Sequence, residues 1–136
     1  MANALYDKGR EGFLDGSINW ASDTIKAVLI DEALYTVDLA AHDFLDDVPA
    51  LARVGTPQTL GAKTVTAGVA DAADITFPSV PLHDPVGAIL IYKFLTDDAH
   101  SQLIAYINSG TGLPVTPNGG DIAVAWSDGA NKIFKL

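Results

Sequence analysis

The sequence predicts a mainly β fold, an antiparallel β-sandwich or barrel-like structure, formed by residues 1–136 as a single domain. About seven short segments rich in β-branched residues recur at spacings of roughly ten residues, with turn residues between them. No long amphipathic helix follows residue 50, which excludes a parallel α/β sheet because its strands need crossover helices. The length of 136 residues is ordinary for one hydrophobic core.

A short helix is predicted over residues 3–14, where apolar side chains recur at helical spacing. Asp15 and Gly16 form a natural stop. We therefore expect a helical arm over residues 1–16, followed by a β domain over residues 17–136. A second short helix is predicted over residues 40–47, before Pro49.

The strands are predicted from β-branched content and from alternation. The clearest strand is residues 24–30, and residues 87–95 should pair with residues 101–108 around the turn at residues 96–99. Residues 101–108 are apolar on both faces, which is typical of a central strand. Further strands are expected at residues 52–56, 63–67 and 74–77, and a closing hairpin from residues 121–126 and 132–136.

Two segments should be loops. Residues 78–85 contain three prolines and cannot continue a ladder of hydrogen bonds. Residues 109–120 are rich in Gly, Pro and Asn, and they are too long to be a simple hairpin connection.

Composition narrows the class of protein. The net charge of −9 disfavours direct binding to nucleic acid or to an anionic membrane, and the chain has no cysteine for disulfides or thiolate sites. Charged residues are only 18% against 49% hydrophobic ones, which suggests buried contacts with other chains. The first residues lack a signal-peptide pattern, and the longest apolar run, residues 86–92, is too short for a membrane span. We expect a soluble protein made in the cytoplasm.

Residues suited to chemistry are scattered. His42, His83 and His100 lie in separate segments, so we expect solvated residues rather than zinc ligands. The acidic cluster at Asp43, Asp46 and Asp47 does not have the alternating pattern of a calcium hand, and a solvated acidic face is the simpler interpretation. Similar acidic pairs occur at residues 71 and 74 and at residues 97 and 98.

No nucleophile motif is present, and neither glycine-rich stretch is followed by the Gly-Lys-Ser/Thr of a phosphate loop. We therefore predict a non-enzymatic protein with no catalytic residues, no cofactor and no resident metal. Four aromatic residues could form a sugar-stacking platform, although such residues usually belong to a core: Trp20, Tyr92, Tyr106 and Trp126.

Six segments taken together resemble a family of small virion structural proteins of tailed bacteriophages. They are ALYDKGREGFL (4–14), DTIKAVLID (23–31), AHDFLDDVP (41–49), LIAYI (103–107), TGLPVTPNGG (111–120) and DGANKIFKL (128–136). The resemblance covers nearly the whole chain and carries no catalytic residues. It implies a place in the virion and other virion proteins as partners, with the major capsid protein as the favoured one.

Within that class, the compact size and acidic surface favour a capsid decoration (cement) protein, acting as a homo-oligomer for which a trimer is one form. A tail, neck or fibre-associated protein is the alternative, and a receptor- or carbohydrate-binding β module is another. Contacts with partners are expected from the N-terminal helix and from the loop over residues 111–118. The candidate contact residues are Leu5, Tyr6, Phe13, Leu113, Pro114, Val115 and Pro117.

Overall fold

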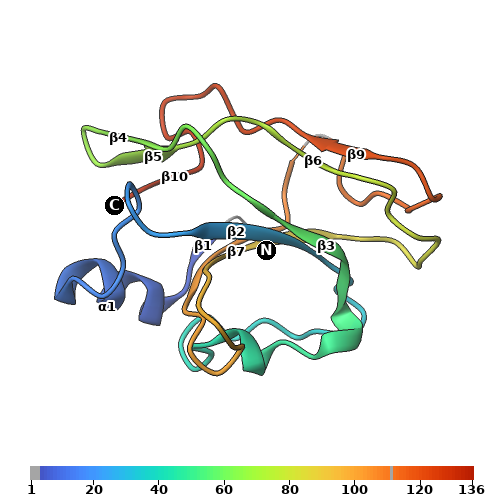
Figure 1. The fold of residues 1–136 in the computed structure, drawn as a ribbon, viewed down its shortest axis with the longest axis horizontal. Coiled ribbons are helices and arrows are strands. Elements are labelled where there is room, and N and C mark those ends of the chain that lie inside the picture. The colour runs from blue at the N-terminus through green and yellow to red at the C-terminus, as the bar shows by residue number, and fades with distance from the viewer. Residues whose placement is uncertain (1–3, 111) are drawn as a thin grey trace.

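The computed structural model describes residues 4–110 and 112–136 and confirms the mainly β prediction. In these residues ten strands form three antiparallel sheets in a sandwich-like arrangement, with one α-helix and two 3₁₀ turns (Figure 1). The elements are β1 (Ala4–Leu5), α1 (Asp7–Asp15), β2 (Ile25–Ile30), η1 (Leu45–Asp47), η2 (Ala50–Ala52), β3 (Arg53–Thr59), β4 (Thr64–Thr66), β5 (Val69–Asp71), β6 (Ile75–Phe77), β7 (Ala88–Lys93), β8 (Leu103–Ile107), β9 (Ile122–Val124) and β10 (Phe134–Lys135).

The largest sheet has five strands in the order β1-β8-β7-β2-β3. Strands β7 and β8 pair antiparallel as the sequence predicts, and β8 has a neighbour on each side. Strand β2 pairs in register with β7 from Ile25 opposite Lys93 to Ile30 opposite Ala88. On its other side β2 meets β3, where the register shifts between Ala27 and Leu29, and Gly55 of β3 adopts a positive φ of 74°. Glycine tolerates this conformation, which is typical of a bulge.

Both faces of the large sheet are buried. In Figure 1, β6 and β9 lie on one side of it, and the segment with the two 3₁₀ turns lies on the other. Alternate residues of β2 therefore enter different cores: Ala27 and Leu29 belong to the first core, whereas Val28 and Ile30 belong to the second. This explains why β2, β7 and β8 are apolar throughout rather than alternating.

The first core fills the space between the large sheet and the two small sheets. Trp20 packs edge-on against Phe134 with ring centroids 5.2 Å apart, and Phe13 lies 5.7 Å from the same ring. Burial of such large aromatic side chains contributes strongly to stability. The first core thereby links the N-terminal part of the chain to its last strand.

The pairing in the small sheets differs from the predicted hairpin of residues 121–126 and 132–136. Strand β9 pairs with β6 and β10 pairs with β5, so the two segments belong to different sheets. Strand β5, which ends at Asp71 and pairs with both β4 and β10, is a strand that the sequence does not predict. Turn residues between two short strands do not decide the partner of either strand, and the apolar core selects it here.

The N-terminal helix is shorter than predicted. Residue 3 lies outside the described residues, Ala4 and Leu5 form β1 against β8, and α1 begins at Asp7. The predicted stop is confirmed, because α1 ends at Asp15 and Gly16 has the left-handed φ of 83°. The expected helical arm is thus a strand followed by a helix, both in contact with the large sheet.

The second predicted helix, over residues 40–47, is wrong in extent. Only Leu45–Asp47 are helical, as a single 3₁₀ turn, and Phe44 forms an isolated bridge with Gln102. Leu45 and Val48 are buried in the second core. The helix does not extend earlier because Phe44 is extended and the Asp43 carbonyl accepts from the Leu103 N–H, which joins these residues to the end of β8. No helix in the described ranges is long and apolar enough to cross a membrane.

A substitution at Gly9 tests how closely α1 approaches the sheet. A Cβ atom at Gly9 would lie 2.8 Å from the Leu103 carbonyl oxygen and 2.9 Å from that of Ile104, so the backbone of β8 would have to move. We expect Gly9→Ala to lower the free energy of unfolding by about 1–3 kcal/mol, although alanine favours a helix. Gly61→Ala is the control, since a Cβ there has no atom within 4 Å. Chemical denaturation measures both; equal effects would contradict the close packing.

The second core contains all four tyrosines, and burial raises the pKa of each. For Tyr92 it raises the pKa to about 12. The folded state therefore holds these protons more tightly than an unfolded chain, whose tyrosines titrate near pH 10. The contribution of Tyr92 to stability is complete below about pH 10 and is lost as the pH rises through about 12.

We accordingly expect no tyrosine to ionise near pH 10 while the protein is folded. Tyrosinate absorbance should appear at higher pH, together with loss of the circular dichroism of the fold. An ionisation step with a midpoint near pH 10 and an intact fold would show that one of the four rings is accessible.

Candidate functional site

The candidate contacts on the N-terminal segment are largely internal. Leu5 is 5% exposed and Tyr6 is fully buried, so their side chains pack inside the chain rather than on its surface. The physical reason is that β1 adds these residues to the large sheet, where they enter opposite cores. Phe13 is half-buried against the first core. The exposed apolar side chain of this helix is instead Leu14, which is 88% exposed.

The candidate loop is also partly internal, and Thr111 lies outside the described residues. Pro117, a candidate contact residue, is buried. Val115 is half-buried, and its N–H and carbonyl both hydrogen bond with Val86. Leu113 is half-buried and Pro114 is exposed after a cis peptide bond, so these two remain available at the surface.

Three exposed leucines lie in segments that meet at Asp31, just after the end of β2. Leu34, Leu51 and Leu82 are 47%, 80% and 79% exposed. The Leu34 N–H donates to the Asp31 carbonyl. Leu51 precedes Ala52, whose carbonyl accepts from the Asp31 N–H, and Leu82 precedes His83, whose Nδ1 lies 3.8 Å from Oδ2 of Asp31. We call Leu34, Leu51 and Leu82 the leucine surface. Clustered apolar side chains of this kind mark sites of protein interaction.

Asp31 connects the segments that carry the leucine surface. Its N–H donates to the Ala52 carbonyl at 2.8 Å, and its Oδ1 accepts from the Ala33 N–H at 2.9 Å. The residue is 2% exposed, and its Oδ2 lies 3.8 Å from Nδ1 of His83. This approach of the two side chains, which is longer than a hydrogen bond, places the proline-rich loop beside the end of the sheet.

The candidate loop starts beside the same end of the sheet. Tyr106 donates to Oε2 of Glu32 at 2.8 Å, and the Asn108 side chain donates to the same oxygen at 3.3 Å. Glu32 also covers Gly87, where a Cβ would lie 2.4 Å from its Oε1. Gly87 follows Val86, which forms an isolated bridge with Val115, so the exposed Pro114 precedes a residue held at this end of the sheet.

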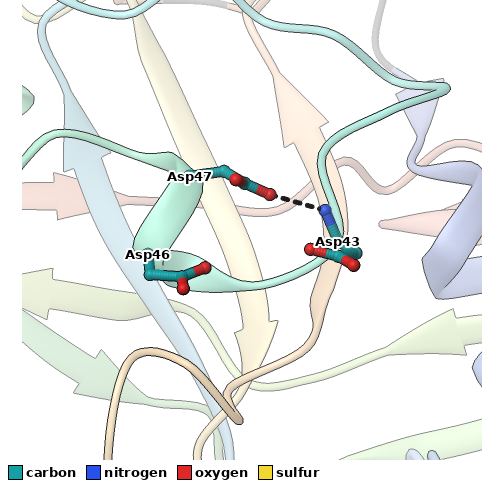
Figure 2. Close-up of side chains that lie close together, drawn as sticks. All are labelled: Asp43, Asp46 and Asp47. Atoms are coloured by element: carbon teal, nitrogen blue, oxygen red, sulfur yellow. Dashed lines mark hydrogen bonds between the residues drawn. The ribbon is translucent and has the colours of Figure 1, made fainter.

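The acidic cluster at Asp43, Asp46 and Asp47 is brought together by η1, as Figure 2 shows. Carboxylate oxygens of the three lie within 4.8 Å of one another. Oδ2 of Asp47 accepts from the Asp43 N–H at 2.9 Å, and this bond is the main reason that the pKa of Asp47 is lowered. Asp46 and Asp47 are exposed and Asp43 is half-buried, which fits a solvated acidic face.

The histidines do not meet. His42 Nδ1 lies 2.8 Å from the Tyr35 hydroxyl, His83 faces Asp31, and His100 Nδ1 lies 2.6 Å from Asp97 Oδ1. Within residues 4–110 and 112–136, the one group that could hold a metal contains no histidine.

The aromatic platform is not at the surface. Trp20 is 4% exposed and Trp126 is 8% exposed, and their indole N–H groups donate to the carbonyls of Asp71 and Ala73. Tyr92 and Tyr106 belong to the second core. The prediction that these four residues are core is confirmed, and they cannot stack on a sugar in this structure.

Comparison with models of protein families finds no match for this chain. No curated protein matches it either. A role for these surfaces is therefore argued from their own exposure, charge and contacts.

Two substitutions in the acidic cluster separate a structural role from simple charge. We expect Asp47→Ala to lower the free energy of unfolding by about 0.5–1 kcal/mol, because it removes the acceptor for the Asp43 N–H. Asp46→Asn should be neutral or stabilising by about 0.3 kcal/mol, since it relieves repulsion between like charges.

The contribution of Asp47 to the free energy of unfolding should decrease as the pH falls. The lowered pKa of Asp47 stabilises the fold at pH values above the unfolded value, and this contribution disappears as the pH falls through the folded pKa. The difference between wild type and Asp47→Ala should therefore shrink in acid. A difference in unfolding free energy that is unchanged down to the lowest pH would contradict this role.

Proposed function

We propose that the chain is a non-enzymatic structural protein of a tailed-bacteriophage virion, and that it acts as a decoration (cement) protein on the capsid. Its partner is the major capsid protein, and it binds as a homo-oligomer, for which a trimer is one form. The proposal rests on the resemblance of six sequence segments to small virion proteins. The observation that gives it a location on the molecule is the leucine surface.

The leucine surface has the properties of a contact site for a rigid protein. Its side chains sit on short connections at the end of a sheet buried on both faces, so little order is lost when a partner binds. Asp31 joins two of these connections through backbone hydrogen bonds. A preformed apolar surface favours association without rearrangement.

Decoration would stabilise a capsid by linkage. A protein that binds the assembled lattice, and not the separate subunits, shifts the equilibrium toward the assembled state. A specific contact of this kind buries about 1,000 Å² or more in total. Three leucines and the exposed Pro114 could form the centre of such an interface, and the net charge of −9 would keep the free protein soluble.

The role is tested on particles of the phage that encodes the chain. We expect antibodies against the chain to label the head shell in electron micrographs, and mass spectrometry of purified particles to give a copy number that is a fixed multiple of the lattice. Label confined to the tail or neck would favour the tail-associated role. Label absent from intact particles, with binding to host cells, would favour the receptor-binding role.

Substitutions in the leucine surface test its part in the contact. We expect Leu51→Ser combined with Leu82→Ser to weaken binding to empty expanded capsids at least about tenfold, because exposed apolar area at the interface is lost. Leu14→Ser is the matched control, since Leu14 is equally exposed but lies on α1. Thermal melts confirm that all variants fold, and equal capsid binding by both would rule out the leucine surface.

A further inference from the structure

A groove at the opposite edge of the large sheet has the properties of a binding site for an acidic peptide. It has a volume of about 360 Å³ and lies between β1 and the last segment of the chain. Its lining combines apolar residues of β1, β8 and β10 with polar ones from the turn before β10. The lining includes the apolar residues Leu5, Ile107 and Phe134 and the basic residues Arg10, Lys132 and Lys135.

The first observation is charge. The groove brings together Arg10, Lys132 and Lys135 in a protein that has eight basic residues against seventeen acidic ones. None of its lining residues is Asp or Glu. The nearby acids are Asp7, which pairs with Arg10, and Asp128, which belongs to the same turn as Lys132 but does not line the groove.

The second observation is that Lys132 and Lys135 have no salt-bridge partner among the described residues. Lys8, Arg10, Arg53 and Lys93 each form a salt bridge with an acidic side chain. Lys132 and Lys135 form none with any carboxylate of the described residues. At physiological ionic strength, charges beyond about 8 Å are largely screened, so the groove presents its own positive potential despite the net charge of the chain.

The third observation is that one cation is held in place. Nη1 of Arg10 donates to the Leu5 carbonyl at 3.2 Å and to Oδ1 of Asp7 at 3.2 Å. An arginine has five N–H donors in a planar fork, and the Nε and Nη2 atoms carry three of them. A guanidinium fixed in this way can accept a carboxylate with little loss of conformational freedom.

The fourth observation concerns shape. Strand β1 is an edge of the five-stranded sheet and β10 is an edge of the three-stranded sheet, and both line the groove. The groove is thus a crevice between two sheet edges, with apolar side chains in its lining. Exposed edges are common sites for an added extended segment, whose alternate side chains point in opposite directions.

From these observations we propose that the groove binds an extended, acidic segment of another polypeptide. Apolar side chains of the segment pack against the half-buried Ile107 and Phe134, and the alternate carboxylates pair with Arg10, Lys132 and Lys135. This site is separate from the leucine surface, and it does not depend on the virion role. It would let the chain hold a second protein while the leucine surface is occupied.

The probe is a fluorescently labelled, capped peptide of eight residues in which Glu alternates with Val, a length that a groove of this size can hold in part. We expect saturable binding by fluorescence anisotropy, and no binding of the matched peptide in which Lys replaces Glu. In a two-dimensional NMR spectrum the bound peptide should shift the amides of residues 132–135 and of Leu5. A probe that does not bind, or that shifts amides elsewhere, overturns the proposal.

Charge reversal supplies the matched variants. We expect Lys132→Glu combined with Lys135→Glu to weaken peptide binding at least about tenfold. Lys8→Glu makes the same type of change on an exposed side chain of α1 outside the groove and should leave the affinity unchanged. Should the double variant fail to fold, Lys135→Glu alone suffices, because Lys135 is exposed. Equal binding by wild type and a folded groove variant overturns the proposal.

Two further measurements distinguish other occupants. A short single-stranded oligonucleotide that binds as tightly as the peptide would show a site for anions in general and overturn the assignment to a peptide. Sedimentation of the chain alone reports self-association. An oligomer that the double charge reversal abolishes, with no peptide binding to the wild type, would identify the occupant as a second copy and also overturn it.

Discussion

The packing of strands β2, β7 and β8 is the constraint on which the rest of the structure depends. Their side chains are apolar on both faces, so neither face can be left in water without a large loss of stability. One face is covered by the two small sheets and the other by the segment with the 3₁₀ turns. The segment with the 3₁₀ turns has no strand pattern in its sequence, yet it contributes Leu45, Val48 and Ala52 to the second core. Its backbone groups are satisfied locally, as when the Asp31 N–H donates to the Ala52 carbonyl.

The predictable part of the fold is the part encoded by local pattern. Strand β2 and the β7–β8 hairpin are apolar, β-branched and bounded by turn residues, and each of these signals lies within a few residues of the strand that it defines. The pairing of β9 with β6 and of β10 with β5 is different, because the partners are about fifty or more residues apart in sequence. Burial of Trp126 and Phe134 in the first core selects those partners. Such a choice depends on the whole core rather than on any one segment.

The contact surfaces show the same division between local and distant information. Leu5 and Tyr6 have the spacing of an amphipathic helix, yet β8 takes them into the sheet, a contact about a hundred residues away. The leucine surface has no signal in the sequence, since each leucine is isolated among polar, small or proline residues. The three leucines come close in the fold only because their separate segments meet near Asp31. The groove basic residues are similarly dispersed, at residues 10, 132 and 135.

The leucine surface and the groove both lie where the large sheet stops, and different residues satisfy its backbone groups at the two places. At the end of β2, the backbone N–H and carbonyl of Asp31 form hydrogen bonds with neighbouring segments, while the side chains of the leucine surface are exposed to solvent. At the β1 edge, the Arg10 guanidinium donates a hydrogen bond to the Leu5 carbonyl, so a positively charged group lies at the surface there. The outer strand at this edge, β1, has only two residues. A sheet completed with an apolar end and a basic edge is suited to bind two different proteins at once, because neither surface is complementary to the other's partner.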